Sequence, residues 1–107
     1  VSEWTLYDPH YTERYLGLPQ DNAAGYRASS VLAYAGKLSR PLLIVHGTTD
    51  DNVYFAHALQ LSDALLRAGK PFEFLPLSNF THMVAEPQVR RNLNQRIIGF
   101  FQRALAP

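Results

Sequence analysis

The chain has 107 residues, and its 10 Lys or Arg against 9 Asp or Glu leave a net charge of +1. This charge is too small to favour binding to nucleic acid or to an anionic membrane. Hydrophobic residues make up 47% and charged residues 18%, a composition that excludes disorder as the main state. Without cysteine the chain cannot form disulfides, thiolate metal sites or a cysteine nucleophile, and no run of about 18 apolar residues predicts a membrane span.

The first third of the chain predicts short helices and no strand. Asp8 offers a capping carboxylate directly before a proline suited to a first helical turn, so a helix is expected over residues 9–16. Residues 21–34 predict further short helical turns, broken by Gly25 and by the serine pair at 29–30.

The remainder predicts the order strand, helix, strand, helix. Residues 41–46 form a short apolar run typical of a strand buried on both faces, and residues 55–68 carry apolar side chains at helical spacing. A second strand is expected over residues 72–77, then a loop over 78–87 and a final helix over 89–104 with its arginines facing water.

A strand, helix, strand unit implies parallel pairing with a right-handed crossover, so the fold class is α/β. Two strands rarely make a stable sheet, and the only methionine is Met83 rather than an initiator, so residues 1–107 are expected to be part of a larger domain. The apolar sheet edge left open predicts association of the chain with itself or with its missing part.

Two residues that could carry chemistry follow the two predicted strands. Asp50 and His82 lie in loops beyond the carboxyl ends of neighbouring parallel strands, where functional residues of α/β sheets gather. A carboxylate that accepts the Nδ1 proton of a histidine prepares the ring to act as a base. Spacing alone leaves open the alternative that Asp50 only turns the chain and His82 is an exposed loop histidine. No G-x-S-x-G elbow is present, so a serine nucleophile must lie before Val1.

Three motifs carry a family resemblance. Residues 4–17 read WTLYDPHYTERYLG, residues 46–53 read HGTTDDNV, and Thr81 precedes His82. Together they resemble the C-terminal end of the dipeptidyl peptidase IV group in the prolyl oligopeptidase family. The resemblance implies an α/β-hydrolase fold, with residues 1–107 as the C-terminal portion of its peptidase domain. It also implies a serine exopeptidase that releases N-terminal dipeptides with Pro, or sometimes Ala, at the second position.

Roles for single residues follow from that resemblance. Asp50 matches the triad acid and His82 the triad base, while Asn52 matches the amide that holds the carbonyl of the substrate's first residue. Four residues match the walls of the pocket for the second substrate residue: Trp4, Tyr7, Tyr11 and Val53. A flat, apolar proline ring suits such aromatic and β-branched walls. Met83 departs from the family, which usually has glycine after its triad histidine.

Other aromatic and histidine side chains have ordinary structural interpretations. Tyr15 is expected to pack in the core, and His46 to hydrogen-bond backbone near the following loop. His10 and His57 are expected at the surface or at its boundary, because no carboxylate or second histidine stands at metal-ligand spacing. The sequence therefore predicts neither a metal site nor a cofactor.

The resemblance also implies partners that the chain does not contain. These are a peptide substrate, the rest of the hydrolase domain, and an upstream β-propeller whose glutamates bind the substrate's free amine. Family members often work outside the cytoplasm, so a periplasmic or extracellular location is favoured by the resemblance alone. A related oligopeptidase or esterase, and a noncatalytic interaction module on the same fold, remain as alternatives.

Overall fold

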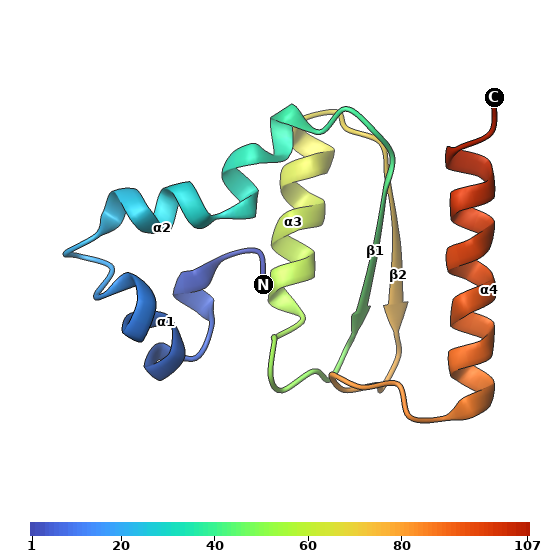
Figure 1. The fold of residues 1–107 in the computed structure, drawn as a ribbon, viewed down its shortest axis with the longest axis horizontal. Coiled ribbons are helices and arrows are strands. Elements are labelled where there is room, and N and C mark those ends of the chain that lie inside the picture. The colour runs from blue at the N-terminus through green and yellow to red at the C-terminus, as the bar shows by residue number, and fades with distance from the viewer.

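A computed structural model describes residues 1–107 and places a pair of parallel strands among helices (Figure 1). Strand β1 (Leu42–Gly47) aligns residue by residue with strand β2 (Phe72–Leu77), so that Leu42 lies opposite Phe72 and Gly47 opposite Leu77. In chain order the elements are η1 (Trp4–Leu6), α1 (Pro9–Leu16), α2 (Ala23–Ser29), η2 (Val31–Lys37), β1 (Leu42–Gly47), α3 (Ala56–Arg67), β2 (Phe72–Leu77) and α4 (Pro87–Ala104). The fold class is α/β, as predicted.

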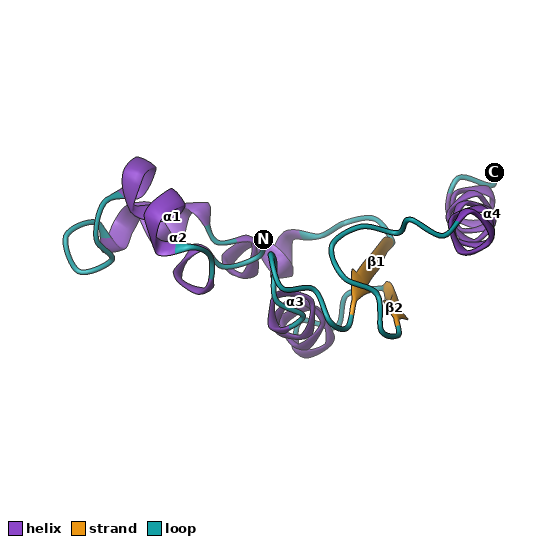
Figure 2. Cartoon of the chain, turned by 90° about the horizontal axis from the view of Figure 1, so that it is seen from below, coloured by secondary structure: helices purple, strands orange, loops and turns teal.

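Helices lie on both sides of the strand pair. Seen along the strands, α3 stands against one face and α4 along the other, while α1 and α2 lie beyond α3 (Figure 2). On the face that carries α4, the Arg103 guanidinium of that helix donates to the Glu73 carboxylate of β2 at 3.1 Å. Because consecutive strand residues point to opposite faces, apolar residues are needed on both faces of β1, which explains its continuous apolar run.

The core lies between β1, α3 and η2. Its four buried members are Ala35, Ile44, Ala58 and Leu65, and partly buried residues from both strands pack against them. Leu65 is the most completely buried of these side chains. Burying a leucine side chain stabilises a fold by roughly 1.5–3 kcal/mol. This cluster fixes α3 on the sheet and thereby sets where the loop between β1 and α3 begins and ends.

Most predicted elements are confirmed, with two corrections in the first third of the chain. The helix over residues 9–16 is present, and Asp8 caps it by accepting from the His10 amide at 2.9 Å. Gly25 does not break the second helix, which runs through it. A Cβ at Gly25 would meet the side chain of Asn22, which caps that helix, so a larger residue there would displace the cap. The short helix at residues 4–6 was not predicted.

The C-terminal helix begins two residues earlier than predicted. Pro87 stands in its first turn, where the missing amide hydrogen of proline has no intrahelical partner to lose. The predicted loop therefore ends at Glu86. None of the helices in the chain combines the length and apolar character needed to cross a membrane.

Candidate active site

The loops that follow the two strands meet at one edge of the sheet. Asp50 lies in the loop after β1 and His82 in the loop after β2, and the Oδ2 atom of Asp50 is 2.9 Å from Nδ1 of His82. Parallel strands end at the same edge, which is why one strand, helix, strand unit separates them in sequence but not in space. The structure thus brings the two predicted catalytic residues into direct contact.

The carboxylate of Asp50 is buried and fully engaged. Its side chain is 5% exposed, and its Oδ1 atom accepts the backbone N–H groups of Asn52 and Val53, each at 2.9 Å. Burial by itself would raise the pKa of Asp50, but the hydrogen bonds from His82 and from the two amides outweigh it and hold that pKa below its ordinary value. Asp50 is therefore an anion throughout the neutral range.

His82 presents the opposite balance of burial and exposure. Its side chain is 49% exposed although Nδ1 faces the buried carboxylate. Because an ionised carboxylate can only accept, Nδ1 of His82 carries the proton and donates it to Asp50. The neutral ring then has an unprotonated Nε2, the atom that can take a proton from a nucleophile.

His46 closes the loop that carries Asp50. Its Nε2 atom lies 2.7 Å from the carbonyl oxygen of Val53, which confirms the predicted hydrogen bond to backbone. The same atom is 3.5 Å from Oδ2 of Asp50. One histidine at the end of β1 therefore holds the far end of the loop close to its start.

Two threonines that sequence analysis did not single out join this loop to the one carrying His82. The Thr48 amide donates to the Leu77 carbonyl at 3.0 Å, and the Thr48 hydroxyl accepts the Asn79 amide at 2.8 Å. Thr49 donates twice to the Phe80 carbonyl, from its amide at 3.1 Å and from its hydroxyl at 3.0 Å. These bonds fix the approach to His82 independently of the bond to Asp50.

Gly47 allows the two loops to approach each other. A Cβ at Gly47 would overlap the carbonyl oxygens of Phe80 and Thr81 and would lie 2.9 Å from the Phe80 carbonyl carbon. Backbone atoms cannot swing aside as a flexible side chain can. The sequence signal was a glycine placed directly after a buried strand, a position where close backbone approach is a common reason for glycine.

The predicted pocket aromatics form one cluster. Trp4 and Tyr11 stack with ring centres 6.2 Å apart, and Tyr7 stands edge-on to both rings at 5.7 Å. Spacing by four on α1 aligns Tyr11 with Tyr15, whose ring centre lies 5.1 Å further along. Tyr15 is 69% exposed, so the prediction that it packs in the core is wrong.

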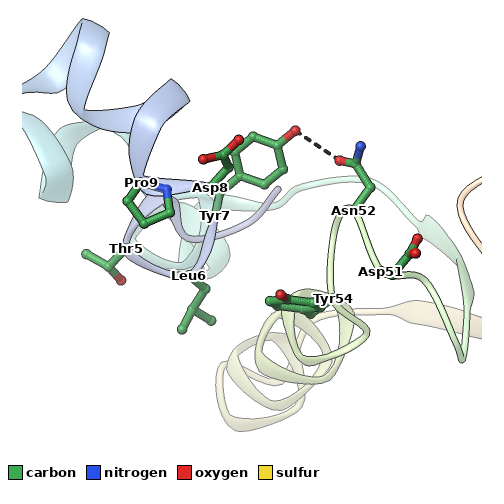
Figure 3. Close-up of a pocket in the computed structure, with 8 residues that line it drawn as sticks. All are labelled: Thr5, Leu6, Tyr7, Asp8, Pro9, Asp51, Asn52 and Tyr54. Carbon is green, nitrogen blue, oxygen red and sulfur yellow. Dashed lines mark hydrogen bonds between the residues drawn. The ribbon is translucent and has the colours of Figure 1, made fainter.

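A hydrogen bond ties this aromatic cluster to the loop of Asp50. The Tyr7 hydroxyl donates to Oδ1 of Asn52 at 2.9 Å across a cavity of about 670 Å³ (Figure 3). Val53, the remaining predicted pocket residue, lines a second cavity of about 290 Å³ together with Asp50 and His82. The predicted site residues therefore line three separate cavities, since Trp4 and Tyr11 share a third one of about 240 Å³.

His57 differs from its prediction. It is 2% exposed and is among the most completely buried side chains, whereas His10 is exposed as expected. The apolar spacing of α3 could not reveal this burial, because the covering group is the chain's own N-terminal segment. No three His, Asp or Glu side chains converge on a point where they could hold a metal ion.

A parallel α/β unit with an acid loop and a histidine loop at one sheet edge has the arrangement of an α/β hydrolase. The chain belongs to the prolyl oligopeptidase family of serine peptidases, whose family model matches residues 1–107. Dipeptidyl peptidase 4 of Bos taurus is 36% identical over 109 residues, and human dipeptidyl peptidase 8 is 38% identical over 108.

A solved structure of a related peptidase has the same fold as this chain. The crystal structure of Porphyromonas gingivalis dipeptidyl peptidase 4 superposes with a TM-score of 0.93 at 36% identity and covers 97% of this chain. The chain spans 15% of that structure, 14% of the bovine relative and 12% of the human one. It corresponds to a small portion of each relative.

Proposed function

We propose that this chain is the acid and base portion of a serine exopeptidase that releases N-terminal dipeptides with Pro or Ala at the second position. The observation that carries the proposal is the 2.9 Å contact between buried Asp50 and half-exposed His82. The nucleophilic serine and the β-propeller belong to parts of the enzyme outside residues 1–107.

In the proposed mechanism, His82 moves the protons. Its Nε2 atom takes the proton of the serine hydroxyl as that oxygen attacks the scissile carbonyl, and returns it to the leaving amine. Water then attacks the acyl-serine while Nε2 takes its proton, and that proton passes to the serine oxygen as the dipeptide is released. The anion of Asp50 keeps the Nδ1 proton in place and stabilises the imidazolium formed in each step. Its two backbone hydrogen bonds hold the carboxylate still while the charge on His82 changes.

Asn52 is proposed to hold the carbonyl of the substrate's first residue. Its Oδ1 atom is occupied by the Tyr7 hydroxyl, so its amide N–H groups are the ones left for an acceptor. Trp4, Tyr7, Tyr11 and Val53 are proposed to enclose the ring of the second residue. Aromatic faces select a flat apolar ring by shape, and proline offers no N–H that such walls would leave unpaired.

Labelling with a fluorophosphonate, which reacts with activated serines, tests the proposal. Intact-mass spectra of the source protein should show one adduct on a polypeptide that contains this sequence, and His82→Ala should abolish it. Asp51→Asn is the matched control, because Asp51 is exposed and lies beside Asp50. A source protein that contains this sequence and takes no label would overturn the peptidase proposal and favour a noncatalytic module. Residues 1–107 alone should remain unlabelled and should self-associate.

A further inference from the structure

A buried histidine outside the proposed catalytic pair anchors the N-terminal segment. Nδ1 of His57 lies 3.2 Å from the Ser2 amide nitrogen and 3.4 Å from the Glu3 amide nitrogen, and the Ser2 hydroxyl donates to the His57 carbonyl at 2.8 Å. An atom that accepts hydrogen bonds from two N–H groups cannot itself carry a proton. The ring is therefore neutral, with its proton on Nε2, which is buried and has no hydrogen-bond partner.

The anchored segment leads directly into the aromatic cluster. Glu3 caps the short helix that starts at Trp4, accepting from the Thr5 amide at 3.2 Å and the Thr5 hydroxyl at 3.1 Å. The other carboxylate oxygen of Glu3 accepts the Ser30 hydroxyl at 2.9 Å. The position of the Trp4 ring thus depends on where the Glu3 backbone is held.

We propose that His57 is a positioning residue for the aromatic cluster, and that only its neutral ring can hold the Ser2 and Glu3 amides. Protonation would turn Nδ1 from an acceptor into a donor that faces two other donors. Both amides would lose their partner, and the segment that places Trp4 would be released from α3. The effect on catalysis rests on the proposed function, because Trp4 is a proposed wall of the substrate pocket.

The groups around His57 favour its neutral form. Burial chiefly lowers its pKa, and the ring of His46 on β1 lowers it further. The Leu6 backbone carbonyl and the Glu3 carboxylate act in the opposite direction. The net pKa of His57 lies below the ordinary value of 6.5, so the anchor is intact at neutral pH and opens on acidification.

Trp4 provides the readout: it is the only tryptophan in residues 1–107, and in the complete protein its emission is obtained as the difference from a Trp4→Phe variant. We would record its emission from about pH 8 down to about pH 4, because the pKa of His57 lies below the ordinary histidine value. His57→Asn places an oxygen where Nδ1 stands and does not titrate, whereas His57→Leu removes the acceptor. His10→Asn is the matched control, since His10 is an exposed histidine on α1.

The wild type and His10→Asn should show a red shift of Trp4 emission on acidification, and His57→Asn should lose that shift. His57→Leu should show the shifted emission at every pH. If His57→Leu fails to fold by circular dichroism, the comparison of wild type with His57→Asn decides alone. An unshifted wild type, or a His57→Asn variant that titrates like the wild type, would overturn the proposal. So would a ¹⁵N spectrum that finds the His57 proton on Nδ1 at neutral pH.

A kinetic measurement separates this proposal from the proposed function. In the complete enzyme, His57→Leu should raise KM for a proline substrate more than it lowers kcat, and His57→Asn should restore KM. A complete enzyme without any peptidase activity would contradict the proposed function only, because the emission titration needs no turnover. An equal loss of kcat in His57→Leu and His57→Asn, with KM unchanged in both, would contradict the positioning role.

Discussion

Replacing Gly47 with alanine tests whether close backbone approach places His82. The added Cβ would overlap two carbonyl oxygens of the His82 loop, and the loop could escape only by moving as a unit. Overpacking a tight contact costs about 1–3 kcal/mol, and the two bonds from Thr49 to Phe80 would weaken as the loop moves. His82 is two residues beyond Phe80, so its contact with Asp50 would lengthen or break.

Urea unfolding of Gly47→Ala and Gly36→Ala measures this cost. Gly36 has no atom within 4 Å of an added Cβ and no positive φ, so its alanine variant controls for the loss of glycine itself. Gly47→Ala should lose about 1–3 kcal/mol, whereas Gly36→Ala should lose nothing. In the complete enzyme, a shift of about 1 Å at His82 should lower turnover by about 100-fold. A Gly47→Ala variant as stable and as active as the wild type would refute the reasoning.

Three further outcomes are expected. The folded pKa of Asp50 lies below its ordinary value of 3.8, so its contribution to the free energy of unfolding should be complete above pH 3.8 and should be lost as the pH drops through the folded pKa. In urea unfolding, the free energy of unfolding of Asp50→Asn should therefore decline less on acidification than that of the wild type. Tyr11→Ala should lower kcat/KM more for proline than for alanine substrates, and equal losses would argue against a proline pocket. Arg103→Gln should change the free energy of unfolding by less than about 1 kcal/mol, because its partner Glu73 is exposed; a larger loss would contradict this.

Local sequence patterns were sufficient to predict the elements that surround the site. Residues 72–77 form the predicted strand, residues 9–16 the predicted helix, and α3 lies within the predicted span of residues 55–68. Parallel pairing is then sufficient to predict that Asp50 and His82 lie at one sheet edge. These features depend on periodicity, capping and crossover handedness, all of which act over short stretches of sequence.

Contacts between distant segments were not predictable in the same way. The burial of His57 depends on Ser2 and Glu3, far away in sequence, and the helix at residues 4–6 forms where Glu3 is held. The role of Thr49 depends on the path of the opposite loop at Phe80. Each of these requires knowing which loops and termini meet, information that no local period carries.

Turnover of Asp50→Asn in the complete enzyme tests the central claim most directly. An asparagine can still accept the amides of Asn52 and Val53, but its NH₂ group would face Nδ1 of His82 and favour the wrong ring tautomer. We expect kcat for a peptide substrate with proline at its second position to fall about 10⁴-fold, with Asp51→Asn unchanged. Turnover of Asp50→Asn within a few-fold of the wild type would contradict the claim that this pair is the catalytic acid and base.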